Sequence, residues 1–405
     1  MKARRYALVA GGGTGGHVLP ALAVARALVE RHGTGSVELV GSRRGLDAQL
    51  VRGTGIPTTL LPGRGFRRRA GAGALLENVS ALAQLAAAAV MALVVVLRRR
   101  PSVVVAMGGY ASVPAALAGT ALGVPLVLVN VDAVPGAANR LVGWFASAAA
   151  VAFEGTRLPR AVVTGAPVRE EVLAVSMPDQ RARTQARRRL GIPAGRRVVG
   201  AVGGSLGARR LNEAVLGLAE LWEDRSEFAV YHVVGARDAA WARQLVPPAR
   251  PGGLWYSQVA YEERMPLFYE AADVVVCRAG ASTVAELTAV GMASVIVPLP
   301  GAPGGHQAAN ASMLERAGAA VVVEDGSCTP ERIARELERI LADEALLGRM
   351  RAAAGGLGRR DALGCVVELV EAHARGGRDA TGDNEGAGPN GPEPPPPGTR
   401  REGNR

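Results

Sequence analysis

The sequence shows the same opening twice: a short apolar run, a glycine-rich turn and then a segment with helical periodicity. The two copies are Tyr6–Ala10, Gly11–His17, Pro20–Arg31 and Arg197–Val202, Gly203–Ala208, Leu211–Glu223. A strand that turns through glycines into a helix is how parallel nucleotide-binding α/β units begin. Two such openings in one chain predict an α/β protein made of two Rossmann-like domains with parallel sheets that face a cleft.

The rest of the chain repeats this alternation of short apolar runs and helical segments. The other predicted strands are Val37–Val40, Ser102–Met107, Leu126–Asn130, Ala149–Phe153, Ala229–Val234, Val274–Cys277, Ser294–Val297 and Ala320–Val323. Prolines and an arginine-rich helix between Thr164 and Arg196 predict the boundary. We expect domains at 1–165 and 166–358, and a helix at about 359–374 that can pack back on the first. The glycine, proline and charged residues of 376–405 predict a disordered tail.

Charge and cysteine content narrow the class of partner. The net charge is +11, with 47 Lys and Arg against 36 Asp and Glu. A basic surface suits phosphate-bearing substrates or anionic lipid. No zinc spacing and no aromatic-plus-basic motif accompany it, so we expect no nucleic-acid partner. Three separated cysteines predict no disulfide or metal site. The first apolar run ends at Gly11, too early for a signal peptide, which favours the cytoplasm.

An apolar segment in the first half leaves three interpretations open. Ala81–Leu97 is interrupted only by Gln84, and it lies between Arg67–Arg69 and Arg98–Arg100. It can be a buried core helix, or an apolar patch with a basic rim that docks on anionic lipid. A membrane-spanning helix is disfavoured, because the segment lies between two strands of one predicted sheet.

The first glycine turn has the chemistry of an anion site. Glycines let backbone N–H groups close on a phosphate, and the following helix N-terminus adds partial positive charge. The next strand ends Leu39–Ser42 without an acidic residue, which argues against NAD, and no Lys-Ser/Thr pair follows for a Walker loop. His17 closes the turn and is a candidate base or ligand. The alternative is a tight structural turn.

Two further turns repeat this arrangement. Gly108-Gly109-Tyr110 follows a strand, and Ser112 is the expected N-cap of the next helix. The carboxyl edge of a parallel sheet is where ligands bind. In the turn that opens the second half, the hydroxyl of Ser205 could donate to a phosphate.

The last two motifs lie in the second half. In Cys277–Glu286 a strand ends and a helix begins near Ser282, so free N–H groups could meet a diphosphate. Glu286 could accept hydrogen bonds from a ribose diol, or it could only complement the helix dipole. Gln307 and Asn310 share a helix face, and their amides could hold sugar hydroxyls.

Taken together, these motifs resemble the MurG family, UDP-N-acetylglucosamine–N-acetylmuramyl-(pentapeptide) pyrophosphoryl-undecaprenol N-acetylglucosamine transferases. The resemblance covers roughly residues 5–373 and also includes Pro167-Val168-Arg169. It implies a GT-B fold and inverting transfer of N-acetylglucosamine from UDP-GlcNAc to the C4 hydroxyl of a lipid-linked muramyl-pentapeptide. It further implies an enzyme on the cytoplasmic face of the membrane, with the donor on the second domain, the acceptor on the first, and no metal or cofactor.

The resemblance also assigns roles to residues. His17 is the implied base or acceptor-orienting group, and the main chain near Glu262 faces uracil. The other implied substrate-binding residues are Thr14, Gly15, Gly16, Tyr110, Asp132, Arg169, Ser205, Ala281, Ser282, Thr283, Val284, Ala285, Glu286, Gln307 and Asn310.

The sequence departs from the family pattern near the expected reaction centre. Asp132 stands where the family has an Asn that contacts the donor sugar, and Asn130 stands where a Glu is usual. Other departures are Ala166, Leu206 and Gly305. A carboxylate accepts hydrogen bonds but cannot donate as an amide does, so Asp132 could share the base role with His17. The alternatives are a related transferase with another acceptor, a non-catalytic UDP-sugar-binding protein and a nicotinamide dehydrogenase.

Overall fold

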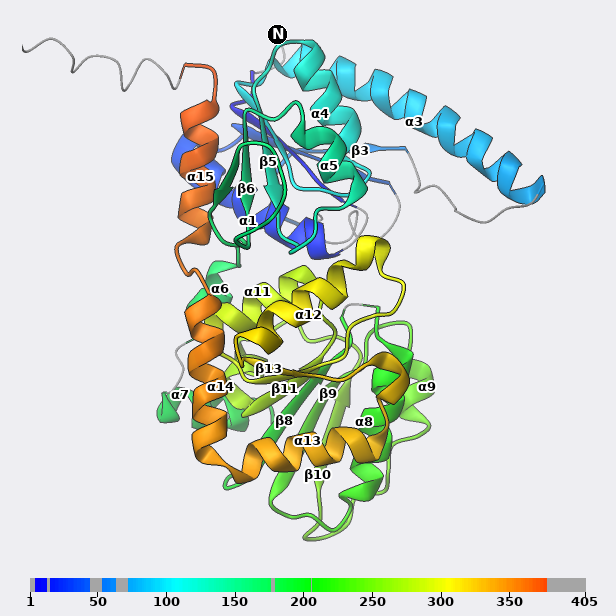
Figure 1. Cartoon of the computed structure of the whole chain (residues 1–405), viewed down its shortest axis with the longest axis vertical. Coiled ribbons are helices and arrows are strands. Elements are labelled where there is room, and N and C mark those ends of the chain that lie inside the picture. Colours follow the sequence, from blue (N-terminus) through cyan, green and yellow to red (C-terminus); the bar gives the residue numbers. More distant parts are fainter. Residues whose placement is uncertain are drawn as a thin grey trace, which may run out of the picture.

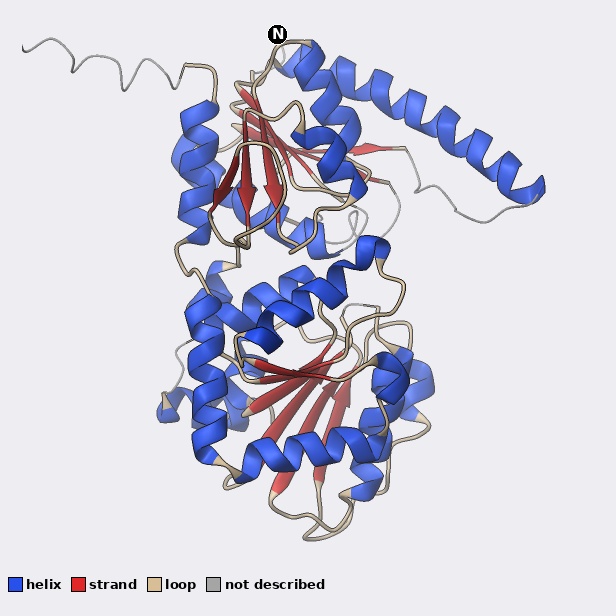
Figure 2. Ribbon diagram, viewed as in Figure 1, coloured by secondary structure: helices blue, strands red, loops and turns tan. Residues whose placement is uncertain are grey.

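The computed structural model describes residues 4–12, 15–43, 53–62, 72–175, 179–204 and 206–376 of the chain. Thr14, Ser205 and Arg67–Arg69 lie outside these ranges, as does the predicted tail after Gly376. Within them the chain forms two parallel sheets with helices on both faces (Figures 1 and 2). The predicted α/β class with two Rossmann-like domains is therefore confirmed.

The first sheet has seven parallel strands in the order β3-β2-β1-β4-β5-β6-β7. They are β1 (Ala7–Ala10), β2 (Val37–Ser42), β3 (Thr58–Leu61), β4 (Val103–Ala106), β5 (Leu126–Asn130), β6 (Ala148–Val151) and β7 (Ala161–Val163). The order reverses direction between β1 and β4, and this switch point is where ligands enter open α/β sheets.

The second sheet has six parallel strands in the order β10-β9-β8-β11-β12-β13. They are β8 (Arg197–Val202), β9 (Phe228–Val233), β10 (Trp255–Val259), β11 (Val274–Cys277), β12 (Ser294–Ile296) and β13 (Ala320–Val322). The order reverses again, between β8 and β11, so each sheet has its own switch point.

Alternating side chains fill a separate apolar layer on each face of both sheets. In the first sheet Val9 and Val105 pack on α1 (Gly15–His32) and α15 (Ala362–His373). Leu8 and Val104 pack on α3 (Ala72–Arg99), α4 (Ser112–Ala121) and α5 (Ala137–Gly143). Since both faces are covered, the strands read as continuous apolar runs.

The second sheet is covered in the same way. The helices on one face are α7 (Gln180–Arg189), α10 (Met265–Ala271), α11 (Ala281–Val290), α12 (His306–Arg316) and α14 (Glu344–Leu357). The short helix α6 (Glu170–Leu173) packs with α10 and α11 on that face. The helices on the other face are α8 (Arg209–Leu221) and α13 (Pro330–Ala342), and the short helix α9 (Ala239–Arg243) packs beside α8. The final helix α15 returns to the first sheet. Figure 1 shows this helix in orange-red beside α1.

A buried ion cluster joins the helices of the second domain to its sheet. Asp273, which is 2% exposed, accepts hydrogen bonds from Arg183 Nη1 at 3.1 Å and Arg187 Nη2 at 2.8 Å. It also accepts from the backbone N–H of Val198 at 2.7 Å, and Arg351 lies 3.5 Å away. A buried carboxylate needs such partners, because burial of an unpaired charge is costly.

Two expectations about helix starts are corrected. Helix α1 begins at Gly15 rather than Pro20, so His17 lies in its first turn. Ser112 is the first residue of α4 rather than its N-cap, because the backbone already turns at Ala111. The Ser112 hydroxyl donates instead to the Gly109 carbonyl, at 2.8 Å.

The apolar segment of the first half forms the long helix α3. Its buried face carries Ala88, Ala92 and Val96, whereas Val90 and Leu97 on the other face are exposed. Figure 1 shows its first turns extending beyond the body of the domain. Within the described part of the chain, no helix has the length and apolar content needed to span a bilayer.

Candidate functional site

Two glycine turns of the first domain lie against each other at the carboxyl ends of β1 and β4. Gly109 has a φ of 76°, and a Cβ there would overlap the Gly12 carbonyl oxygen. The same Cβ would lie 3.1 Å from Cδ2 of His17, and a Cβ on Gly108 would lie 3.4 Å from Cε1. The imidazole of His17 is therefore seated directly on this pair of turns.

The helix that follows β11 meets α1 across the domain boundary. The Ser282 hydroxyl in the first turn of α11 donates to the Gly16 carbonyl at 3.3 Å. Ala281 packs into the apolar layer beneath the first sheet. The N-cap of α11 is Gly280, which supplies no side-chain acceptor to the first N–H groups. Unsatisfied N–H groups and the helix dipole favour an anion at such an end.

One turn into α11, Glu286 is the centre of a buried polar cluster. Its Oε1 accepts from Arg169 Nη2 at 2.9 Å, and its Oε2 accepts from the Tyr269 hydroxyl at 2.8 Å. Burial and the Glu286 charge raise the pKa of Tyr269 well above its usual value, so the phenol remains a donor. Burial opposes the charge on Arg169, but the Glu286 carboxylate outweighs it and raises the pKa of Arg169. A carboxylate has about four lone-pair sites, so it can accept further hydrogen bonds.

Asp132 and Asn310 form a second bridge between the domains. Asp132 follows β5, and its Oδ1 accepts from Asn310 Nδ2 at 3.0 Å. The backbone N–H of Ala133 donates to Asn310 Oδ1 at 2.8 Å, and Asn310 Nδ2 also donates to the Ala279 carbonyl at 3.1 Å. Glu286, Asn310 and Ser282 thus lie on one side of the boundary, and His17 and Asp132 on the other.

The remaining predicted residues have defined surroundings. Gln307 Oε1 accepts from the Leu299 N–H at 2.9 Å, and the Tyr110 hydroxyl shares a hydrogen bond with Ser42. Glu262 is buried, and its Oε2 accepts from Tyr231 at 2.6 Å. Burial opposes ionisation of Glu262, but hydrogen bonds from Tyr231 and Arg264 lower its pKa.

Within α11 only some side chains can meet a ligand. Val284 and Ala285 are buried in the apolar core of the second domain, so any contact they make with a donor runs through the main chain. Ser282 and Thr283 are half-buried at the boundary. The hydroxyls and N–H groups of the first turn are therefore the available donors.

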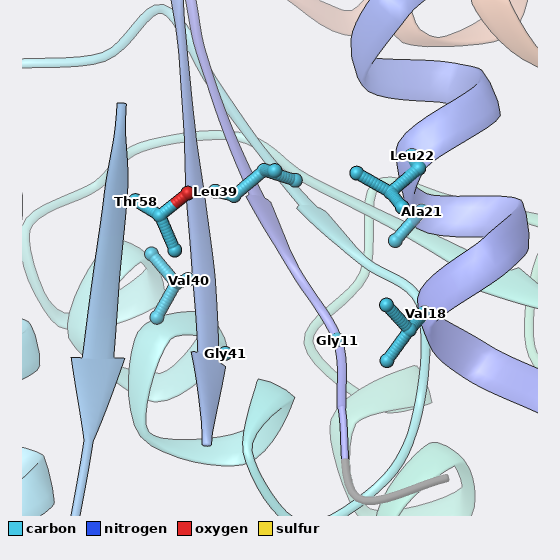
Figure 3. A pocket seen from close by; sticks show the side chains of 8 residues that line it. All are labelled: Gly11, Val18, Ala21, Leu22, Leu39, Val40, Gly41 and Thr58. Carbon is cyan, nitrogen blue, oxygen red and sulfur yellow. The ribbon is translucent and has the colours of Figure 1, made fainter. Parts of the chain in front are cut away.

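A small pocket behind the first glycine turn has no such chemistry. Figure 3 shows it between α1 and the β2–β3 edge, with Val18, Ala21 and Leu22 of α1 facing Leu39 of β2. Its volume is about 10 Å³, close to that of one water probe. It is a packing gap of the core rather than a substrate site.

Comparison with known proteins agrees with this geometry. Residues 7–151 match the glycosyltransferase family 28 N-terminal domain and residues 198–363 match its C-terminal domain. Proteins named UDP-N-acetylglucosamine--N-acetylmuramyl-(pentapeptide) pyrophosphoryl-undecaprenol N-acetylglucosamine transferase are similar over most of the chain. That of Desulforudis audaxviator is 36% identical and covers 90% of this chain and 97% of its own length. That of Streptomyces coelicolor is 35% identical, with 91% and 100% covered.

The chain belongs to the MurG family.

Solved structures agree with this assignment. Acinetobacter baumannii MurG superposes with a TM-score of 0.69 at 28% identity, covering 91% of this chain and 99% of that one. CalG4, the calicheamicin glycosyltransferase, superposes with a TM-score of 0.63 at 16% identity and so shares the fold. The GT-B fold implied by the MurG resemblance is confirmed.

Two polar residues of the site were not predicted from the sequence. Tyr269 donates to Glu286 from α10, and no local motif marks it. Asn139 donates from α5 to Asn130 Oδ1 at 2.9 Å, directly behind the position where this chain departs from the MurG pattern. Asn139 lies in the first turn of α5, and none of the motifs in the sequence marks it.

Proposed function

We propose that this chain transfers N-acetylglucosamine from UDP-N-acetylglucosamine to a lipid-linked muramyl-pentapeptide and so forms lipid II. The observation that carries the proposal is that the N-termini of α1 and α11 meet at the domain boundary, where Ser282 donates to the Gly16 carbonyl. His17 lies on one side of this contact, and Glu286 lies on the other. The names of relatives that match the chain over nine-tenths of its length supply the substrates.

The donor is held by the second domain. The first turn of α11 offers N–H groups to the diphosphate, and Glu286 accepts from the ribose hydroxyls while Arg169 and Tyr269 fix its orientation. Gln307 is half-buried on α12, the helix that carries Asn310, and it orients the sugar. Thr14 and Ser205, which lie outside the described residues, complete the donor site in this proposal.

The reaction is a displacement with inversion at C1 of the sugar. The C4 hydroxyl oxygen of the acceptor forms a bond to C1 as the bond from C1 to the UDP oxygen breaks. The hydroxyl proton passes to a base, and we assign this role to His17 because its ring is held on the glycine turns. Negative charge that develops on the departing UDP is stabilised by the α11 N-terminus.

The protein acts at the cytoplasmic face of the membrane as a peripheral enzyme. Exposed apolar side chains lie on α3, α4 and α5, which cover one face of the first sheet, and directly after α5: Val90, Leu93, Val94, Leu97, Leu117, Leu141, Trp144 and Phe145. Trp144 is 73% exposed, and Arg98 in the last turn of α3 and Arg100 just after it are exposed as well. Apolar side chains with a basic rim match an anionic lipid surface.

Two measurements test the activity. UDP release is followed with UDP-N-acetylglucosamine and either lipid I or other hydroxyl acceptors, and we expect turnover with lipid I. His17→Ala should lower kcat by roughly 10²–10⁴-fold, the contribution of a general base. His32→Ala, at the opposite end of α1, is the control and should keep wild-type turnover. Turnover only with another acceptor would refute the proposed substrate.

Vesicle flotation tests the membrane surface. Binding to anionic vesicles should fall when Leu141 and Trp144 are both changed to Ser, and when Arg98 and Arg100 are both changed to Glu. Arg99 is left unchanged, because its Nε pairs with the buried Glu38 at 2.7 Å. Leu221→Ser is the matched control, because Leu221 is 51% exposed and Leu141 is 50% exposed, but Leu221 lies in the second domain. Equal binding by all variants would refute this surface.

A further inference from the structure

The structure assigns Asp132 a positioning role: its carboxylate fixes the Asn310 carboxamide across the domain boundary. This bond stabilises the arrangement of the two domains described above, which we call closed, and to which the donor binds. The inference rests on the proposed function for its donor. It places Asp132 apart from the base role that the sequence left open to it.

The orientation of Asn310 follows from its partners. Its Oδ1 meets the backbone N–H of Ala133, which can only donate. Its Nδ2 meets the Ala279 carbonyl and the Asp132 carboxylate, which accept. Both Nδ2 hydrogens are therefore used, and a flipped amide would place acceptor against acceptor. Asn310 is 0% exposed, so water cannot replace these partners.

In the first domain, the loop that carries Asp132 is held by two buried amide side chains, those of Asn130 and Asn139. Asn130 Nδ2 donates to the Asp132 carbonyl at 2.6 Å, and Asn139 Nδ2 donates to Asn130 Oδ1 at 2.9 Å. The Asn139 amide also lies against the glycine turn, since a Cβ on Gly108 would be 3.0 Å from its Oδ1. The Gly108 turn that seats His17 is thus connected to the loop that carries Asp132.

On the other side of the domain boundary, the same series of hydrogen bonds reaches α11, the helix proposed to bind the donor. Ala279, whose carbonyl accepts from Asn310, immediately precedes Gly280, the N-cap of α11. The path from the Gly108 turn to the start of α11 therefore runs through the Asp132–Asn310 bond. Asp132 consequently favours the closed arrangement before any substrate is present.

The consequence for the enzyme is a change in donor affinity rather than in the chemical step. If binding requires the closed arrangement, the apparent Kd equals the intrinsic Kd divided by the closed fraction. Loss of the bridge lowers this fraction, so affinity falls while bound substrate still reacts. An essential base would give the opposite result, with a loss of kcat and little change in Kd.

The bridge is tested first without substrate, by hydrogen–deuterium exchange of the peptide that contains Ala133. Its N–H is protected by Asn310 Oδ1, so Asp132→Ala and Asn310→Ala should speed exchange by roughly tenfold or more. Asp132→Asn retains an oxygen that accepts from Asn310 Nδ2 and should restore protection. Glu154→Ala, an exposed carboxylate in the loop after β6, is the control and should exchange like the wild type. Unchanged exchange in Asp132→Ala would overturn the inference.

Donor affinity is then measured by calorimetry with UDP-N-acetylglucosamine, and kcat by UDP release. Asp132→Ala should weaken binding roughly tenfold and leave kcat within about threefold. Asp132→Asn should recover the affinity. In the Asn310→Ala background, Asp132→Ala should add less than about twofold, since the two residues act through one bond. A loss of kcat at unchanged Kd, not restored by Asn, would overturn the positioning role. If the wild type bound no UDP-N-acetylglucosamine, the proposed function would fail, and amide exchange alone would decide whether the bridge exists.

Discussion

Gly109→Ala tests whether the contact between the two glycine turns positions His17. An alanine Cβ at Gly109 would overlap the Gly12 carbonyl oxygen and lie 3.1 Å from Cδ2 of His17. Carbon atoms pack best at about 3.5–4.0 Å, so the imidazole must move by roughly half an ångström or more. The φ of 76° adds strain of about 1–2 kcal/mol for a residue with a Cβ.

The expected loss of activity follows from that displacement. A misplacement of about 1 Å can cost on the order of 10²-fold in rate, so a shift of half that size should lower kcat by about tenfold to a hundredfold. The matched control is Gly33→Ala, just past the other end of α1. Gly33 also has a positive φ, of 87°, but no other group lies within 4 Å of its added Cβ.

The assay is UDP release with lipid I, together with the thermal midpoint of each variant. Both variants carry the left-handed strain, and Gly109→Ala should lose more stability because its Cβ also overlaps the Gly12 carbonyl oxygen. Turnover is therefore measured well below both thermal midpoints, where only Gly109→Ala should lose it. If both keep wild-type kcat, the contact of the glycine turns does not position the base. If both lose kcat equally, the effect comes from stability rather than from the site.

Three further predictions concern buried polar groups. Asp273→Asn should lower the free energy of unfolding by about 3–5 kcal/mol, because the surrounding arginines lose their charge partner, whereas Asp224→Asn at the surface should change it by less than about 1 kcal/mol in denaturant titration. Burial lowers the pKa of His232 to about 3, against 6.5 when exposed, so the unfolded chain binds the proton first as pH falls. Between pH 6.5 and 3 this group should cost about 1.4 kcal/mol of stability for each unit of acidification, and His232→Gln should remove that slope from the unfolding curves. Tyr269→Phe leaves one Glu286 oxygen without its donor and should raise the KM for UDP-N-acetylglucosamine roughly fivefold to tenfold at similar kcat, and an unchanged KM would show that Arg169 alone orients the carboxylate.

Every interior strand was predicted from the sequence, together with the edge strand β13, and the missed strands are all at sheet edges. Interior strands such as β1 and β11 are buried on both faces and appear as continuous apolar runs. The three missed strands are β3, β7 and β10, whose residues are mostly half-buried or exposed. An edge strand is paired on one side only, so its side chains need less apolar character.

The candidate site was predictable where its chemistry follows a strand directly. The glycine turns, His17, Ser282 and Glu286 each lie just after an apolar run, and the carboxyl edge of a parallel sheet gathers such positions. The Ser112 cap was predicted wrongly, because Ala111 already has helical backbone angles and the Ser112 hydroxyl donates back to the Gly109 carbonyl instead of accepting from the helix.

The sequence alone determined the two-domain α/β architecture, because apolar runs and glycine turns act through local backbone preference and burial. It could name Asp132 and Asn310 but not their relation, since 178 positions separate them. Only the tertiary structure decided that they bond to each other across the domain boundary and that Tyr269 orients Glu286. Hydrogen bonds of this kind depend on the distance and direction between groups on different elements, and the packing of two separate cores sets both.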